Sequence, residues 1–420
     1  MKARLGAVGL ALMLAFAVPG SALAAADDAP QPAAYRDQPP LAYVSDGRVF
    51  VLEGNGNPAL QVRGVSGACC VAFSPDGYYV AFQRGNDLWV VEHDGTGLHR
   101  AARSVQRWAW APDGQALAVI PKPAPDGSGG TGIQFYGAED SSVRETLLRD
   151  HRVLDLSWSG FGRRIAVSAV PAASSAGAAD SSEVFMLEVP GPYGEDCPEL
   201  CPEPPLRVPV EHADAGSGPL FASWSPNVDA IAVWTALDDG ATLGLVSPRG
   251  GGITPIAPTL VRRSWVQWSR SGDRLLVVEG GARDPAAARA LLLCAGTAGC
   301  HSVTGGDQPV ADPAWSRAGA MAYVWTDRRE LWVANRDGGE ARRIAAAGDG
   351  VHSPRWLPDG RHLVFVRQGL VWLLDPSSGE PASPVAGPLG AGSAAPAAPA
   401  QEPTDHARDS RWEVLYSVAP

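Results

Sequence analysis

The hydrophobic and polar positions of this chain follow a repeated pattern. Each copy starts with an aromatic residue, continues through a tight turn of the Ser-Pro-Asp-Gly kind, and ends in a strand of alternating apolar residues. The clearest copy runs from Phe73 through the turn 74–77 to the apolar strand 79–82. Further copies start 37 to 66 residues apart, at Trp110, Trp158, Trp224, Trp268, Trp315 and Trp356. These spacings are typical of the blades of a β-propeller.

The turn residues explain why two strands meet in each copy. Proline fixes φ for the first corner of a turn, and the aspartate side chain accepts hydrogen bonds from its own backbone. Glycine supplies a positive φ at little steric cost. Third strands follow at residues 87–91, 330–333 and 369–373, and a more polar fourth strand, such as residues 341–344, completes the unit. Four antiparallel strands per repeat make one blade, so we expect an all-β propeller over residues 40–386.

An incomplete unit precedes the first aromatic copy. It contains second, third and fourth strands but no first strand, at residues 41–44, 49–52 and 60–62. A ring that lacks one strand has an unpaired edge. The C-terminal segment 410–420 contains an apolar run and follows an Ala/Pro/Gly-rich linker at 387–409, so it could supply the missing strand. We therefore expect eight blades closed by strand exchange between the termini. Seven blades are the alternative for the ring, and a docking segment is the alternative role of residues 410–420.

The repeated aromatic residues have a structural explanation. A large ring on each sheet fills the wedge between neighbouring blades. We interpret the whole set as blade-packing residues rather than as ligand-stacking residues: Phe73, Trp110, Trp158, Trp224, Trp268, Trp315 and Trp356.

The aromatic-Ser-Pro-Asp-Gly turn, followed by strands such as residues 79–82 and 88–90, resembles the repeat of the TolB-type propellers. The propellers of prolyl oligopeptidases and dipeptidyl peptidases carry a similar repeat. The resemblance covers residues 40–386 and implies the fold far more than it implies a function. TolB-like proteins also carry an α/β domain before the propeller, and the peptidases append an α/β-hydrolase domain. We expect neither domain here, because only a short leader over residues 25–39 precedes the propeller.

The first residues have the order of a secretory signal peptide. Two basic residues precede an uncharged, mostly apolar run over residues 5–18, and a triplet of small residues ends at Ala24. We expect residues 1–24 to be removed and the mature chain to be periplasmic or secreted. An uncleaved membrane anchor is the alternative. No later run of apolar residues is long enough to predict a membrane-spanning helix.

Charge narrows the class of partner. The chain has 34 Lys and Arg against 45 Asp and Glu, a net charge of −11. Binders of nucleic acid and of anionic lipid need basic residues to displace counterions. We therefore expect no binding to nucleic acid or to anionic lipid. We also expect a monomer that does not insert into a membrane and whose partner is a cell-envelope protein or peptide.

The six cysteines could form disulfides in an exported protein. Three pairs are close in sequence: Cys69 with Cys70, Cys197 with Cys201, and Cys294 with Cys300. The last pair flanks a Gly-containing turn and could bridge a hairpin. The adjacent pair could bridge itself, pair elsewhere or stay reduced. We expect any bridges to be structural, because no Cys-x-x-Cys redox motif occurs.

Motifs for catalysis are missing from the sequence. No Gly-x-Ser-x-Gly nucleophile turn occurs, and the closest candidate, Ser159 with Gly160, lies in a repeat turn. The sequence also has no calcium loop and no phosphate loop. We therefore expect a non-catalytic interaction module with no cofactor and no catalytic residue.

Charged and histidine residues precede several first strands, where a propeller has one mouth of its central channel. The candidates for binding at this mouth are Arg107, His151, His212, Arg263, Asp312 and His352. The histidines could converge on a metal, as in a propeller lyase of uronate oligosaccharides with a similar repeat, but their unequal distances from the repeat aromatic predict no metal site. The charged residues could hold a peptide. A carbohydrate-binding or lyase-like protein, and a regulatory propeller for a separate hydrolase, are the alternatives.

Overall fold

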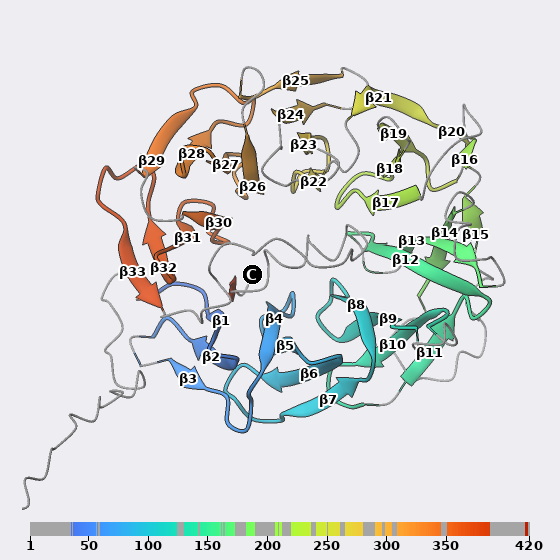
Figure 1. Ribbon diagram of the computed structural model, residues 1–420, viewed down its shortest axis with the longest axis horizontal. Coiled ribbons are helices and arrows are strands. Elements are labelled where there is room, and N and C mark those ends of the chain that lie inside the picture. Colours follow the sequence, from blue (N-terminus) through green and yellow to red (C-terminus); the bar gives the residue numbers. More distant parts are fainter. Residues whose placement is uncertain are drawn as a thin grey trace, which may run out of the picture.

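Eight four-stranded antiparallel sheets form a closed ring in the computed structural model of this chain (Figure 1). The structure describes residues 35, 37–55, 57, 59–123, 130–141, 143–160, 162, 164–172, 182–189, 206–208, 210–211, 220–236, 241–249, 251–260, 265–279, 290–295, 299–304, 309–345, 351–386 and 416–418. Within these ranges, no helix is long and apolar enough to cross a membrane. The expectation of an all-β propeller with eight blades is confirmed, and the seven-bladed alternative is wrong.

Blades 2 to 8 each take their four strands in chain order, whereas blade 1 combines three N-terminal strands with one C-terminal strand, and the blades follow the chain around the ring (Figure 1). Blade 1 contains β1 (Leu41–Ser45), β2 (Arg48–Leu52), β3 (Leu60–Gln61) and the C-terminal β34 (Tyr416–Val418). Blade 2 contains β4 (Ala68–Phe73), β5 (Tyr79–Arg84), β6 (Asp87–Glu92) and β7 (His99–Ala102). Blade 3 contains β8 (Val105–Trp110), β9 (Ala116–Pro121), β10 (Ile133–Gly137) and β11 (Val143–Leu147). Blade 4 contains β12 (His151–Trp158), β13 (Arg164–Pro171), β14 (Glu183–Glu188) and β15 (Leu206–Val208).

The second half of the ring repeats this arrangement. Blade 5 contains β17 (Leu220–Trp224), β18 (Ile231–Ala236), β19 (Ala241–Val246) and β21 (Thr254–Leu260). Blade 6 contains β22 (Trp265–Trp268), β23 (Leu275–Glu279), β24 (Ala290–Cys294) and β25 (Cys300–Ser302). Blade 7 contains β26 (Val310–Trp315), β27 (Met321–Trp325), β28 (Glu330–Ala334) and β29 (Arg342–Ala345). Blade 8 contains β30 (His352–Trp356), β31 (Leu363–Arg367), β32 (Leu370–Leu374) and β33 (Ser383–Ala386), and a parallel pair, β16 (Val210–Glu211) with β20 (Gly251–Gly252), links blades 4 and 5.

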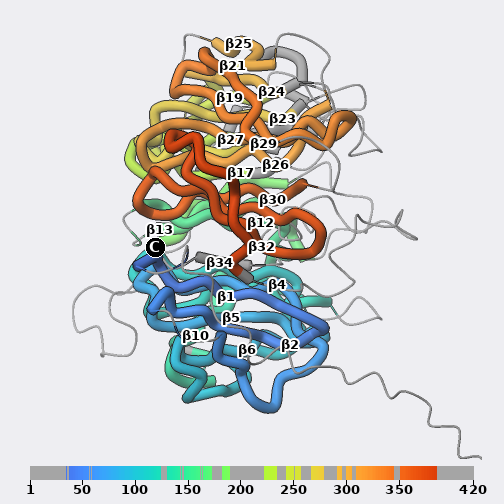
Figure 2. Tube along the Cα trace, turned by 90° about the vertical axis from the view of Figure 1, so that its left-hand side faces the viewer, coloured from blue at the N-terminus to red at the C-terminus, as the bar shows by residue number. Residues whose placement is uncertain are grey.

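The two ends of the chain close the ring together. Strand β34 pairs antiparallel with β1, so that Leu41 lies opposite Val418 and Tyr43 opposite Tyr416. It supplies the innermost strand that blade 1 lacks, and it lies beside β4 of blade 2 (Figure 2). The predicted strand exchange is therefore confirmed for residues 416–418, whereas the linker 387–409 and residues 410–415 lie outside the described ranges.

The turns between first and second strands have the geometry that their residues predict. In blade 2 the amide of Gly77 donates to the carbonyl of Ser74 at 2.8 Å, and Gly77 has a φ of 76°. Gly114 and Gly360 close the matching turns of blades 3 and 8 with φ values of 77° and 69°. A side chain at these positions would be strained, because only glycine adopts this region freely.

These turns also pack against one another around one face of the ring, which we call the turn face. The side-chain Nε2 of Gln115 in blade 3 donates to the Asp76 carboxylate of blade 2 at 2.8 Å. The Ser225 hydroxyl of blade 5 donates to the carbonyl of Gly272 in blade 6 at 3.1 Å. A Cβ built on Gly160 of blade 4 would lie 1.6 Å from the carbonyl oxygen of Pro226 in blade 5. The turns on this face are therefore tightly packed, and at some positions a larger side chain would clash with the neighbouring blade.

The repeated aromatic residues lie at the seams between blades. Phe73 is 6% exposed and packs with Ala42 and Val51 of blade 1. The indole of Trp268 donates to the carbonyl of Ser223 at 3.1 Å, which is the residue just before the repeat tryptophan of blade 5. Trp110 and Trp315 make the matching bonds to blades 2 and 6 at 3.4 Å. These three tryptophan rings thus combine apolar packing, worth about 1.5–3 kcal/mol when fully buried, with one hydrogen bond across the seam.

One of the predicted disulfides is present. Cys294 and Cys300 lie directly opposite each other on β24 and β25 and are bonded to each other. Closing so short a loop contributes about 2 kcal/mol in the chain-entropy description. Cys69 and Cys70 are not in disulfide bonds, and Cys197 and Cys201 lie outside the described residues.

Candidate functional site

The innermost strands of blades 2, 7 and 8 share a bulge at the same register. In each, the pairing with the second strand skips two residues, and the first of these lies three positions before the repeat aromatic. These residues are Cys70, Asp312 and Ser353, with φ values of 61°, 51° and 54°. A left-handed conformation costs a residue with a Cβ about 1–2 kcal/mol. Bulges of this kind redirect side chains, and strained residues are frequent at functional sites.

Two of the predicted channel residues connect neighbouring blades. Arg107 of blade 3 forms an ion pair with Asp155 of blade 4 at 2.7 Å, and both side chains are largely buried. Asp312 of blade 7 accepts a hydrogen bond from the backbone amide of Ser353 in blade 8 at 2.8 Å. Burial raises the pKa of Asp312, against the opposing effects of the Ser353 amide and the Arg355 charge. Both residues therefore make contacts that hold adjacent innermost strands together.

The structure does not bring the predicted histidines together. His151 begins β12 in blade 4, where Nδ1 lies 2.8 Å from Asp150 and the ring packs edge-on against Phe185. His352 begins β30 in blade 8, half-way around the ring, and its Nδ1 lies 3.0 Å from the Ser353 hydroxyl. Among the described residues, no three His, Cys, Asp or Glu side chains are placed to hold a metal ion. His212 and Arg263 lie outside the described residues and stay predictions.

A polar cavity opens on the turn face, where the turns of blades 6 and 7 face each other. It has a volume of about 290 Å³. The cavity is lined mainly by the first turns of blades 6 and 7, with one further residue from blade 5 and one from the turn between β28 and β29. The lining residues are Asn227, Ser269, Arg270, Ser271, Trp315, Ser316, Arg317, Ala318, Gly319 and Arg336. We call this cavity the arginine pocket.

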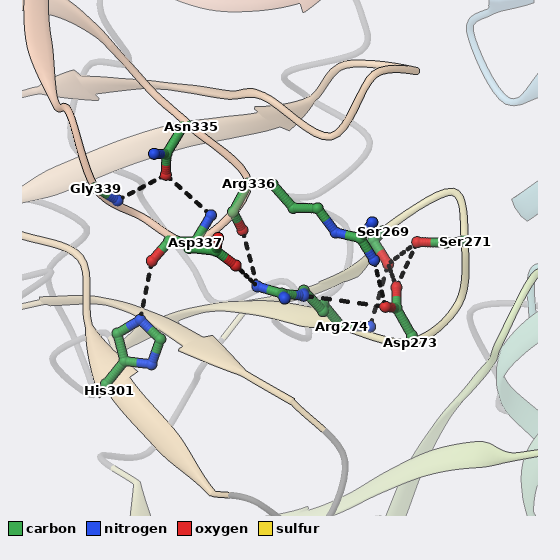
Figure 3. A network of polar contacts seen from close by, with 9 residues as sticks. All are labelled: Ser269, Ser271, Asp273, Arg274, His301, Asn335, Arg336, Asp337 and Gly339. Atoms are coloured by element: carbon green, nitrogen blue, oxygen red, sulfur yellow. Dashed lines mark hydrogen bonds and ion pairs between the residues drawn. The ribbon is translucent and has the colours of Figure 1, made fainter.

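Two ion pairs that cross the seam hold one wall of the pocket (Figure 3). Arg336 of blade 7 reaches the Asp273 carboxylate of blade 6. In the opposite direction, Arg274 of blade 6 lies 2.7 Å from the Asp337 carboxylate of blade 7 and donates to the carbonyl of Arg336 at 3.0 Å. The carbonyl of Asp337 lies 3.2 Å from Nε2 of His301. The Arg336 side chain is therefore held by Asp273, while Arg274 holds the backbone at the same residue.

The pocket has an excess of positive charge. A hydrogen bond from the Ser271 hydroxyl lowers the pKa of Asp273, and Ser269 and Arg336 lower it further against the effect of burial. Asp273 is therefore an ionised carboxylate that balances Arg336. Arg270 and Arg317 have no acidic partner within ion-pair distance among the described residues. Both are exposed, and two unbalanced guanidinium groups at one cavity favour an anionic ligand.

The hydroxyl of Ser316 adds a further polar group to this wall. Ser316 is 2% exposed, and within the described part of the chain its Oγ has no hydrogen-bond partner. In other blades the matching serine is paired; Ser74 Oγ, for example, accepts from the amide of Tyr79 at 2.9 Å. A buried hydroxyl without a partner costs about 1–3 kcal/mol, which a polar ligand could offset.

The sequence contained a signal for this pocket that pattern reasoning missed. The residue after the turn serine, or after the residue in its place, is proline in four blades: Pro75, Pro112, Pro226 and Pro358. In blades 6 and 7 the same position holds Arg270 and Arg317. These two arginines lie in adjacent blades, so the ring brings them to one cavity. Treating these copies only as degenerate repeats concealed their common feature.

Comparisons with known proteins identify the fold and no family. No protein-family profile matches the sequence, and no curated protein is similar to it in sequence. Among solved structures, the dihydro-heme d1 dehydrogenase NirN in complex with DHE superposes with a TM-score of 0.56 at 14% identity, over 84% of this chain and 74% of that one. A eukaryotic initiation factor gives 0.54 at 14% identity, over 83% and 84%. The C-terminal WD40 domain of Sif2 gives 0.51 at 13% identity, over 79% and 90%.

These similarities show that the chain is a β-propeller. The three proteins include a dehydrogenase and two proteins that are not named as enzymes, so the shared fold leaves the function open. The function has to be argued from the site.

Proposed function

We propose that this chain is an exported, non-catalytic propeller that binds an acidic segment of a cell-envelope protein in the arginine pocket. The observation that carries the proposal is the pair Arg270 and Arg317, which replace the turn proline in two neighbouring blades and line one cavity. The TolB-type repeat and the signal-peptide pattern of residues 1–24 support the envelope location. Channel residues such as Arg107 are already held by contacts between blades.

The size and charge of the pocket favour a protein side chain over a larger ligand. A cavity of about 290 Å³ is at the lower limit for small-molecule sites and holds one or two carboxylate side chains. Guanidinium groups bind carboxylates through paired, charge-assisted hydrogen bonds. The chain as a whole is acidic, with a net charge of −11, and therefore repels most anions. The pocket is a local positive region that attracts them.

The chemistry of the pocket favours binding over catalysis. Its described lining residues include three serines and three arginines but no histidine and no cysteine. A serine nucleophile needs an adjacent base, and here Ser271 instead donates to Asp273. If the partner is a separately encoded hydrolase, the chain is its regulatory propeller.

Reversing the two unpaired charges should abolish partner binding. We expect the double variant Arg270→Glu, Arg317→Glu to lower the amount of captured partner by a factor of about ten or more. The reason is that each charge-assisted hydrogen bond contributes about 1.5–3 kcal/mol. The mature chain, residues 25–420, is immobilised, incubated with cell-envelope extract and washed, and the retained proteins are quantified by mass spectrometry.

The matched control is Arg63→Glu, Arg103→Glu, which makes the same charge change at exposed positions of blades 1 and 2. It should retain the partner at the level of the unchanged protein. Equal loss in both variants would show that only net charge matters. Undiminished capture by the pocket variant would refute the assignment of the pocket.

A further inference from the structure

The sulfur atoms of the adjacent residues Cys69 and Cys70 lie closer together than the contact distance of two unbonded sulfur atoms. Their Sγ atoms lie 2.7 Å apart. A disulfide bond measures about 2.05 Å. Unbonded carbon atoms, which are smaller than sulfur, make contact at about 3.5–4.0 Å. The two sulfur atoms therefore lie well within contact distance, and a small displacement would bring them to the length of a disulfide bond.

The bulge in β4 explains how neighbouring residues reach this arrangement. In a regular strand, successive side chains point to opposite faces, so adjacent cysteines cannot meet. Here the pairing of β4 with β5 jumps from Cys69 to Ala72, and Cys70 has a φ of 61°. This conformation turns the Cys70 side chain back towards Cys69. Asp312 and Ser353 lie in the same kind of bulge at the same register. The bulge is therefore a recurring feature of the innermost strands, and in blade 2 it carries two adjacent cysteines.

The two thiols are partly exposed to solvent, and Cys69 is the nucleophile of the pair. Both residues keep partial exposure on the innermost strand, which also lies beside the closing strand β34. The hydrogen bond with Cys70 lowers the pKa of the Cys69 thiol, against the effect of burial. A lower pKa increases the fraction of thiolate, which is the species that attacks disulfides.

We propose that Cys69 and Cys70 are a reversible redox site of the channel wall, which forms a vicinal disulfide by exchange with a disulfide-bearing oxidant such as oxidised glutathione. The Cys69 thiolate attacks one sulfur of the oxidant, and one thiolate leaves. Cys70, on losing its proton, attacks the Cys69 sulfur of the mixed disulfide and releases the second thiolate. Two cysteine thiols are oxidised, one external disulfide is reduced to two thiols, and the two cysteine protons end on the released thiolates. The site is distinct from the arginine pocket and does not depend on it.

Peptide mapping tests this site without a variant. Trypsin cleavage after Arg63 and Arg84 releases a peptide in which Cys69 and Cys70 are the only cysteines. The mature protein is equilibrated with oxidised and reduced glutathione at graded ratios, alkylated and digested. We expect the doubly alkylated peptide to be replaced by one that has lost two hydrogens and carries no glutathione, and dithiothreitol to reverse the change. The peptide with Cys294 and Cys300 serves as an internal standard for a closed disulfide.

Single-thiol variants identify the intermediate. Cys70→Ser should keep a glutathione adduct on Cys69, because no neighbour can displace it. If the unchanged protein keeps glutathione adducts on both cysteines, or stays fully alkylated at ratios that leave Cys294–Cys300 closed, the proposed site is wrong.

Discussion

Replacing Gly160 with alanine is expected to destabilise the protein more than any other single methyl group added to the turn face. The new Cβ would lie 1.6 Å from the carbonyl oxygen of Pro226, and this neighbour is backbone rather than a flexible side chain. Overpacking costs about 1–3 kcal/mol and occasionally more, and this contact belongs at the upper end. We therefore expect the free energy of unfolding to fall by about 3 kcal/mol or more and Tm by about 4 °C or more, measured by thermal unfolding.

Gly252→Ala is the matched control for this prediction. Gly252 also has no left-handed φ, and a Cβ built on it meets no atom within 4 Å. Its substitution should leave Tm nearly unchanged. If the two variants unfold at the same temperature, blades 4 and 5 do not pack through their turns as described.

Ending the chain at Ala386 is expected to produce the second large loss of stability. The truncation removes β34, so the inner edge of β1 loses its partners opposite Leu41, Ala42 and Tyr43. Each lost ladder hydrogen bond costs about 1 kcal/mol, and the buried apolar side chains of β1 gain access to water. We expect a clear drop in Tm, and faster hydrogen exchange in residues 41–45 than in the full chain.

A synthetic peptide of residues 410–420 should restore part of the lost stability, because a ligand that binds only the folded state raises Tm. An unchanged Tm and unchanged exchange in residues 41–45 after truncation would contradict closure by β34. In that case residues 410–420 would act as a docking segment, and blade 1 would be stable with three strands.

Most of the fold could be predicted because it depends on local residues repeated many times. The turn glycines specify their own φ, and Gly77, Gly114 and Gly360 adopt it in the structure. Closure also followed from counting strands, since blade 1 lacked a first strand and residues 412–418 offered one. These inferences need only the sequence of each unit and its place in the repeat.

The bulges were missed because the innermost strands read as ordinary apolar segments. Pro313 and Pro354 were a usable signal, since proline cannot donate to a ladder and occurs within strands mainly at bulges and edges. Nothing comparable marks Cys70, which adopts the same conformation without a following proline. Its position became visible only from the register of β4 against β5.

The candidate site depended on distances around the ring that sequence cannot provide. His151 and His352 share a place in their repeats, but they lie in blades 4 and 8, half-way around the ring from each other. Arg270 and Arg317 are 47 residues apart in sequence and line one cavity, because consecutive blades are neighbours. Comparing equivalent positions in adjacent repeats would have found them, whereas searching for catalytic motifs did not.

The central claim, that the arginine pocket binds an acidic protein partner, is tested most directly by crosslinking in cells. A benzophenone-bearing amino acid is placed at Ala318, which lines the pocket, and separately at Val143, an exposed residue of blade 3. Illumination should give one defined adduct from position 318, none from position 143, and none from position 318 once Arg270→Glu and Arg317→Glu are added. No adduct at position 318, or one that persists after both charges are reversed, would contradict the account.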